Sequence, residues 1–360
     1  MSSLPGGFMF MRRFNKEVAG FMKPMILTIV VPCYNEEEVL VDTFRQLREV
    51  LNELMKENLV APESKILFVD DGSKDRTWSM ISTENAKHPY VTGLKLARNV
   101  GHQKALLAGL EAACAKSDCV VSIDADLQDD IKVIRDFVLL YHEGFDIVYG
   151  VRAARKTDTW FKRNTANAYY RLMTRLGVRL VPNHADFRLM SKRAIMELSR
   201  YDESNLFLRG IVPLIGYPSA KVYYDRKERL AGSSKYNLRK MLSFAMDGIA
   251  SFSVAPVRMV TCLGFGLLLV SIAAGFYTLI QKWNGDTHAG WTSIMLSIWF
   301  LGGLQLLGMG IMGEYIGKIF IEVKRRPKYA VELDLYSRAF QSDKEASPRL
   351  LPLRSPRPVK

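Results

Sequence analysis

Hydrophobic residues follow two different patterns along this chain. From residue 25 to about 235, short apolar runs alternate with segments in which apolar residues recur every three or four positions. The first run is Ile26–Pro32, and the segment Glu37–Glu57 behind it has helical spacing. Further runs of strand length are Ile66–Val69, Val91–Ala97, Cys119–Ile123 and Asp146–Tyr149. Apolar strands separated by helices predict an α/β domain over residues 25–237, with a parallel sheet covered on both faces.

The pattern changes in residues 257–317, which contain two long apolar runs. Residues 260–280 and 291–313 contain no Asp, Glu, Lys or Arg, and the ten residues 281–290 join them. At about 1.5 Å per residue, each run can cross a hydrocarbon core of about 30 Å. The sequence therefore predicts a transmembrane hairpin. A pair of buried core helices is the alternative, which suits uncharged runs of this length less well.

Positive charges on both sides of the hairpin set its orientation. Arg258 precedes the first run, and the segment 318–337 behind the second run is rich in Lys and Arg. Positive residues remain on the cytoplasmic side, so both chain ends are predicted to be cytoplasmic. Residues 238–256 have an apolar stripe at helical spacing and predict an interfacial amphipathic helix, with a surface helix of the soluble domain as the alternative.

The two ends of the chain lack a clear pattern. Residues 1–24 place their apolar side chains before Arg12 and Arg13, which is the wrong order for a secretory signal, and predict a flexible arm. Residues 338–360 contain four prolines among scattered basic residues and predict a disordered tail.

Composition narrows the classes of partner. Lys and Arg number 50 against 37 Asp and Glu, which gives a formal net charge of +13. Such a balance indicates phosphates or anionic lipid as partners, and no helix-turn-helix, zinc-finger or RNA-recognition signature favours nucleic acid. The four cysteines are scattered without ligand spacing, so we expect reduced thiols and no structural zinc.

Polar residues follow three of the predicted strands at the point where each strand ends. They occur in the segments 32–36, 70–73 and 124–129. Ligands bind beyond the carboxyl ends of the strands in such sheets, so these segments are predicted to meet at one site. Asp124 and Asp126 present two carboxylates there, and oxygen ligands of this kind suit Mg²⁺ or Mn²⁺ held together with substrate phosphates.

Seven motifs in order carry a family resemblance. They are PCYNE (32–36), DDGSKD (70–75), ARNVGHQKALLAGL (97–110), DADLQDD (124–130), ADFRLM (185–190), RLAGSSKY (229–236) and GEYIGKIFIEVKRRPKY (313–329). Together they resemble the polyprenyl-phosphate glycosyltransferases of family 2, which have a GT-A fold and are similar to dolichyl-phosphate mannose synthase. The match is best with the bactoprenol glucosyltransferase branch, which has two C-terminal spans. It departs at Ala185 and Asp130, where the family usually has Gly and Pro.

The resemblance implies roles for individual residues. The nucleotide-sugar donor would lie against Pro32, Tyr34, Glu36, Asp71, Arg98 and Asn99. The metal and the donor diphosphate would lie at Asp124, Asp126 and Gln128, and substrate phosphates at Arg229, Ser234 and Lys235. Asp186 would act as catalytic base or as a ligand that orients the sugar or the acceptor, and both roles stay open.

The reaction implied is an inverting sugar transfer, from UDP-glucose to undecaprenyl phosphate at the cytoplasmic face of a bacterial inner membrane. The lipid-linked sugar would serve envelope glycan or lipid modification, through a separate flippase and a downstream glycosyltransferase. Other donors stay open, namely GDP-mannose, UDP-GlcNAc and UDP-formamido-arabinose. A processive polysaccharide synthase would need more spans and a Gln-x-x-Arg-Trp element, which the sequence does not contain. A non-catalytic membrane adaptor is a further alternative, against which the intact Asp124, Asp126 and Asp186 argue. A homo-oligomer also stays open.

Charge predicts further candidates near the site. Two anionic substrates repel each other, and cations must offset this repulsion. Arg152 and Arg155 are candidates beside the motif residues, with a solvated loop at the lipid headgroups as an equal alternative. His102 and His184 lack partners at ligand spacing, so neither is predicted to bind metal.

Overall fold

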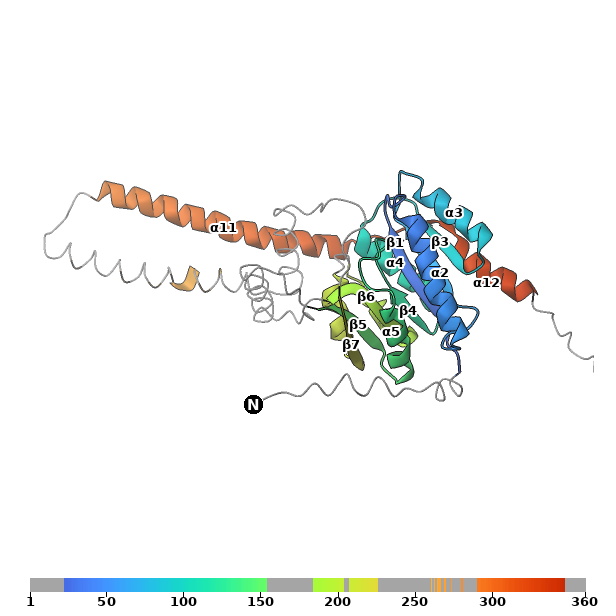
Figure 1. Cartoon of the computed structure of the whole chain (residues 1–360). Coiled ribbons are helices and arrows are strands. Elements are labelled where there is room, and N and C mark those ends of the chain that lie inside the picture. Colours follow the sequence, from blue (N-terminus) through green and yellow to red (C-terminus); the bar gives the residue numbers. More distant parts are fainter. Residues whose placement is uncertain are drawn as a thin grey trace, which may run out of the picture.

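A computed structural model of the chain describes residues 23–153, 184–203, 207–225 and 290–346, with isolated positions between 260 and 280. The described residues form an α/β domain around one eight-stranded sheet, and a long helix extends away from it (Figure 1). The strand order in the sheet is β7-β5-β6-β4-β1-β2-β3-β8. The predicted α/β domain is therefore present.

Four parallel strands form the centre of the sheet. They are β1 (Leu27–Cys33), β2 (Lys65–Asp70), β3 (Val91–Leu96) and β4 (Cys119–Ser122). Their side chains are almost entirely buried on both faces, which is why these segments are uniformly apolar in the sequence. The four strands coincide with the predicted runs, so this part of the prediction is confirmed.

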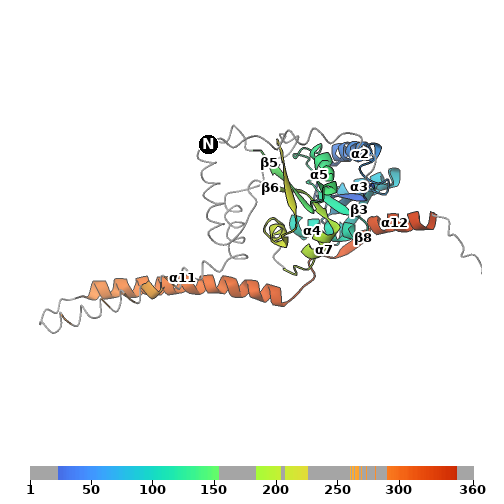
Figure 2. The ribbon, with the colours of Figure 1, turned by 90° about the horizontal axis from the view of Figure 1, so that it is seen from below.

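Helices cover both faces of the sheet and divide the core into two layers (Figures 1 and 2). One face carries α2 (Leu40–Lys56), α3 (Thr77–Lys87) and α5 (Val133–His142). The other carries α4 (His102–Cys114), α7 (Lys192–Leu198), α8 (Leu208–Ile211) and the 3-10 turn Val212–Ile215. In α4, a side chain at Gly109 would meet Val30 at 2.4 Å and Val69 at 2.7 Å, so glycine permits this close packing.

The remaining strands make the sheet mixed. β5 (Ile147–Arg152) pairs in parallel with β7 (Ser219–Tyr224), but β6 (His184–Ser191) lies antiparallel between β4 and β5. The prediction of a wholly parallel sheet is therefore wrong at this end. β6 contains Asp186 and Arg188 among its apolar residues, so its sequence does not read as a buried strand.

The register of β6 matters for the site. Ser122 of β4 lies opposite Arg188 of β6, and the two strands run in opposite directions. Moving two residues forward along β4 and two residues back along β6 reaches Asp124 and Asp186. The antiparallel insertion thus brings the beginning of β6 to the edge where β4 ends.

The chain after the predicted second span is more ordered than its composition indicates. β8 (Val331–Asp334) pairs antiparallel with β3 at the edge of the sheet, and α12 (Leu335–Ala346) follows. The predicted disordered tail is wrong for residues 338–346, and the basic segment 318–337 includes an edge strand. Tyr336 explains the order, because its side chain is fully buried and bonds Thr28 at 2.9 Å and Ser117 at 3.2 Å.

Helix α11 spans Trp291–Val323, which includes the second predicted span and continues ten residues beyond it. Within the described part of the chain, no helix meets the combined length and hydrophobicity required for a membrane crossing. The predicted arm 1–24 lies outside the described residues except for its last two positions. The interfacial helix 238–256, most of the span 260–280 and the residues after 346 also lie outside them.

Candidate active site

The first two loops at the carboxyl edge of the sheet are joined by backbone hydrogen bonds. The N–H of Asp71 donates to Cys33 O at 2.9 Å, and the N–H of Asn35 donates to Ser73 Oγ at 3.0 Å. Glu36 N donates to Thr77 Oγ1 at 3.0 Å. The predicted donor residues Tyr34 and Glu36 therefore lie where these two loops meet. Tyr34 is exposed there, whereas Pro32 is buried at the end of β1.

Asp71 supports the neighbouring loop. Its buried carboxylate accepts the backbone N–H of Val100 at 2.7 Å and that of Gly101 at 2.9 Å. Arg98 and Asn99 lie in this loop with exposed side chains. Burial raises the pKa of Asp71, and the two backbone N–H groups oppose that effect. Both oxygens of Asp71 are therefore occupied by the loop.

The DAD motif follows β4 directly. Asp126 Oδ1 accepts the backbone N–H of Gln128 at 3.3 Å, and Leu127 between them has a positive φ of 43°. Gln128 is buried, whereas Asp124 and Asp126 are partly exposed. Asp124 Oδ1 is a buried oxygen without a hydrogen-bond partner among the described residues. This carboxylate oxygen is the kind of group that a divalent cation satisfies.

The described residues of this site offer few protein ligands for a metal ion. No group of three or more His, Cys, Asp or Glu side chains in the described ranges is arranged to hold a metal ion. Mg²⁺ is commonly held by one or two carboxylates together with substrate phosphates. Asp124 and Asp126 fit that kind of binding, in which the donor diphosphate supplies the other ligands.

Asp186 lies at the beginning of β6 and is almost fully buried. It accepts Arg188 Nη2 at 2.7 Å and Gln103 Nε2 at 3.2 Å. Arg209 approaches with both Nε and Nη2, at 3.3 and 3.0 Å. His102 Nε2 lies 3.4 Å from the same carboxylate.

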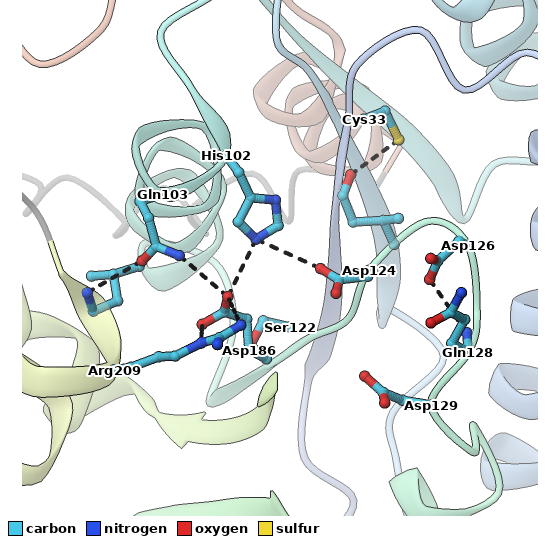
Figure 3. A network of polar contacts seen from close by, with 12 residues as sticks. Cys33, His102, Gln103, Ser122, Asp124, Asp126, Gln128, Asp129, Asp186 and Arg209 are labelled. Atoms are coloured by element: carbon cyan, nitrogen blue, oxygen red, sulfur yellow. Dashed lines mark hydrogen bonds and ion pairs between the residues drawn. The ribbon is translucent and has the colours of Figure 1, made fainter. Parts of the chain in front are cut away.

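His102 connects the two acidic residues of the site. Its Nε2 atom lies 3.4 Å from Asp186 Oδ2 and 3.6 Å from Asp124 Oδ1 (Figure 3). It is the first residue of α4, at the end of the loop that Asp71 supports. Both carboxylates are distant from His102 in the sequence, so the spacing of residues along the chain gave no sign of these contacts.

The charges around Asp186 shift its pKa and that of its neighbours. Burial raises the pKa of Asp186, but His102, Arg209 and Arg188 outweigh this effect and hold it well below the usual range. Desolvation lowers the pKa of His102, but Asp186 and Asp124 outweigh it and raise the net value. Burial raises the pKa of Asp124, as do nearby carboxylates, against the opposing effect of His102. Asp186 is thus a permanent anion at neutral pH.

The other predicted site residues are placed differently. Arg152 forms a two-point ion pair with the buried Asp129, through Nε at 2.9 Å and Nη2 at 3.2 Å. Arg155, Arg229, Ser234 and Lys235 lie outside the described residues. Sequence reasoning missed Gln103, Arg188 and Arg209 as site residues. Gln103 lies in the motif 97–110 and Arg188 in the motif 185–190, which were the available signals, whereas Arg209 lies in none of the seven motifs.

Two family models match the chain. Glycosyl transferase family 2 matches residues 28–199, which cover the strands β1 to β6 and the acidic loops. The GtrB C-terminal hairpin matches residues 255–319. A glycosyltransferase domain and a C-terminal hairpin thus follow each other in the order that the sequence motifs predict.

Curated relatives extend over most of the chain. A bactoprenol glucosyl transferase of Shigella phage SfII is 40% identical over 310 residues, which cover 86% of this chain and 98% of the relative. A prophage bactoprenol glucosyl transferase homolog of Escherichia coli is 38% identical, over 86% of this chain and 99% of the relative. The uncharacterized glycosyltransferase YkoT of Bacillus subtilis is 67% identical, over 87% of this chain and 93% of the relative.

Solved structures match at lower identity. Mannosyl-3-phosphoglycerate synthase from Rubrobacter xylanophilus is 16% identical with a TM-score of 0.43, over 71% of this chain and 83% of that protein. Glucosyl-3-phosphoglycerate synthase from Mycobacterium tuberculosis, in complex with Mn²⁺, UDP-glucose and phosphoglyceric acid, is 17% identical with a TM-score of 0.41, over 65% of this chain and 80% of that protein.

The mixed α/β sheet with acidic loops at its carboxyl edge defines a glycosyltransferase with a GT-A-like fold. The chain belongs to the family 2 polyprenyl-phosphate glycosyltransferases, the family of the bactoprenol glucosyl transferases. It is therefore a glycosyltransferase.

Proposed function

We propose that this enzyme transfers glucose from UDP-glucose to undecaprenyl phosphate, with inversion at the sugar carbon. The bactoprenol glucosyl transferases at about 40% identity over nearly their whole length carry this proposal. The arrangement of the described site supports it. Exposed Tyr34 and the loop of Arg98 and Asn99 offer a surface for the nucleotide, beside the carboxylates of Asp124 and Asp126.

The chemistry suits these groups. The leaving group is a nucleoside diphosphate, which gains negative charge as the glycosidic bond breaks. Mg²⁺ or Mn²⁺ at Asp124 and Asp126, with Gln128 as a third candidate ligand, would neutralise this charge. The attacking group is a phosphate oxygen, and the second pKa of a phosphate monoester is about 6. The acceptor is therefore mostly dianionic at neutral pH and needs no strong general base.

The acceptor requires the enzyme to work at a membrane. Each CH₂ group transferred to water costs about 0.8 kcal/mol, so a polyprenyl chain stays in the bilayer. Large apolar side chains of α11 are exposed, among them Ile298, Phe300, Met309, Ile316 and Phe320. Their exposure and the hairpin family match support an α11 that lies in the bilayer. We place the site at the cytoplasmic face of the bacterial inner membrane, with the product left there for a separate flippase and a downstream glycosyltransferase.

Donor choice can be tested directly with the purified full-length chain. Undecaprenyl phosphate in detergent, Mg²⁺ or Mn²⁺ and a panel of labelled nucleotide sugars are combined, and the lipid extract is measured for label. We expect label from UDP-glucose and the release of UDP. Label from GDP-mannose, UDP-GlcNAc or UDP-formamido-arabinose alone would change the donor and keep the class of acceptor. No labelled lipid with any donor would overturn the proposed function.

Topology is tested separately in cells. A cysteine introduced in the connector 281–290 is exposed to a membrane-impermeant maleimide, in a chain whose Cys262 is replaced by Ser. We expect labelling in intact cells, because the connector then lies outside the inner membrane. Labelling only after the cells are opened would contradict this orientation.

A further inference from the structure

Asp186 lies at the junction of three elements that are far apart in the sequence. It belongs to β6, Gln103 belongs to α4, and Arg209 belongs to α8. Gln103 bridges the other two, because its Nε2 donates to Asp186 at 3.2 Å while its Oε1 accepts the N–H of Leu208 at 3.2 Å. Figure 3 shows Gln103 and Arg209 converging on Asp186. The position of Arg209 is thus set by contacts on both sides.

The two arginines that contact Asp186 differ in exposure. The side chain of Arg188 is 1% exposed, whereas that of Arg209 is 41% exposed. Arg209 donates to Asp186 through Nε and Nη2, and its Nη1 has no partner among the described residues. An arginine held by one edge retains donors on its other edge, and a planar guanidinium suits phosphate geometry.

Charges of both signs surround Arg209. Asp186 and Asp124 are negative, whereas Arg188 and Arg152 are positive. A divalent cation at Asp124 would add positive charge to this region, which an anionic substrate group would offset.

We infer that Arg209 binds a phosphate group of a substrate, and that Asp186 and Gln103 are positioning residues that hold it. This inference rests on the proposed function and assigns a substrate contact to its site. Asp186 suits a positioning role because four side chains already contact its carboxylate, and three of them carry or can carry positive charge. A carboxylate held in that way is a weak acceptor of a further proton.

Two substrates could supply the phosphate, namely the diphosphate of the donor and the monophosphate of the lipid acceptor. The test therefore measures KM for UDP-glucose and for undecaprenyl phosphate separately. It also measures the affinity for UDP with Mg²⁺ by calorimetry, which does not depend on turnover. The variants are Arg209→Gln and Arg209→Lys, with Arg200→Gln as the matched control because Arg200 is 76% exposed and pairs only with Glu197 among the described residues.

We expect Arg209→Gln to raise KM for one of the two substrates by about 10- to 100-fold, since a hydrogen bond to a charged group contributes about 1.5–3 kcal/mol. The substrate affected identifies the phosphate. Arg200→Gln should behave like the wild type. If both KM values and the UDP affinity of Arg209→Gln stay within twofold of wild type, the inference is wrong.

A double-mutant cycle distinguishes a positioning role of Asp186 from a direct chemical role. If Asp186 holds Arg209, Asp186→Asn should raise the same KM as Arg209→Gln, and the double variant should be no worse than the more impaired single variant. A fall in kcat at unchanged KM would indicate a direct chemical role and would contradict positioning. Losses that multiply in the double variant would do the same.

Two further measurements separate a failure of the inference from misfolding of the variant and from a failure of the proposed function. If Arg209→Gln does not fold, Arg209→Lys keeps a positive charge beside Asp186 and carries the test, because lysine cannot reproduce the two-point contact. If the wild type transfers no sugar, the proposed function fails. Direct binding of UDP and of undecaprenyl phosphate to wild type and Arg209→Gln then decides the inference, which fails if both ligands bind the two proteins equally.

Discussion

The carboxylate of Asp71, just after β2, accepts the backbone N–H of Gly101 at 2.9 Å, one residue before α4 begins. Gly101 has a φ of +92°, a conformation that glycine adopts without strain. This contact connects the second acidic loop to the first residue of the helix, His102. It therefore links the loop that we propose for nucleotide binding with the carboxylates of Asp124 and Asp186.

Replacing Asp71 should weaken donor binding through the loop. Asp71→Asn turns an amide NH₂ toward the backbone N–H of Val100 or Gly101, which leaves one donor without an acceptor at a cost of about 1–3 kcal/mol. We expect UDP affinity to fall about tenfold in calorimetry. Asp118→Asn is a matched control, since Asp118 accepts the N–H of Ile26 at 2.8 Å at the opposite edge of the sheet. Equal UDP affinity in both variants would contradict this role.

The carboxylates after β4 should be essential for turnover. Asp126→Ala and Asp124→Asn remove proposed metal ligands, and loss of metal-dependent charge stabilisation should lower kcat by at least about 100-fold. EDTA should abolish wild-type transfer, and Mn²⁺ or Mg²⁺ should restore it. Glu49→Gln, at an exposed position of α2, is the control. Near-normal turnover of Asp126→Ala, with normal thermal unfolding, would disprove the metal assignment.

The free energy of unfolding should decrease in acid as Asp146 becomes protonated. Burial raises the pKa of Asp146, but hydrogen bonds from Arg193 and Ser191 outweigh this and lower the net value. A carboxylate whose pKa is lower in the folded state stabilises the fold above its unfolded pKa, about 3.9, and this stability is lost as the pH falls through the folded pKa.

The comparison of wild type with Asp146→Asn isolates this effect. We expect the variant to be less stable by about 1–3 kcal/mol at pH 7, because its interactions with Arg193 are weakened. The difference should shrink below about pH 4. Thermal unfolding from pH 3 to 7 measures both quantities. A difference that stays constant over this range would show that ionisation of Asp146 does not contribute.

The C-terminal segment should stabilise the sheet edge. Tyr336 is fully buried against α4 and the sheet. Its ring packs edge-to-face on that of Phe340, with the two ring centroids 5.1 Å apart. Tyr336→Ala should therefore cost about 3–5 kcal/mol, while Tyr336→Phe should cost about 1 kcal/mol. Tyr223→Ala, at an exposed position, should be nearly neutral.

Amide hydrogen exchange shows which strands are destabilised by Tyr336→Ala. In Tyr336→Ala, protection should fall first in β8 and in β3, because Leu94, Lys95 and Leu96 pair with β8. The ion pair of Lys95 with Glu332 at 2.9 Å should be lost with it. Unchanged protection of β3 would contradict a stabilising role for this segment.

The sequence predicted the centre of this protein well. The four parallel strands are buried on both faces, so each must be apolar along its length, and that requirement is visible in a single sequence. The acidic loops follow directly from those strands, because the carboxyl ends of parallel strands meet at one edge. The order of the motifs and the apolar runs then indicated the family.

Only the tertiary structure decided which residues surround Asp186. The strand β6 is inserted antiparallel between β4 and β5, and its polar residues hide it from a hydrophobic pattern. His102, Gln103 and Arg209 reach Asp186 across sequence separations of 84, 83 and 23 residues, and no local pattern records such contacts. The C-terminal strand was hidden for a similar reason, since an edge strand buries only part of its surface, and β8 is held by pairing with β3 and by the neighbouring buried Tyr336.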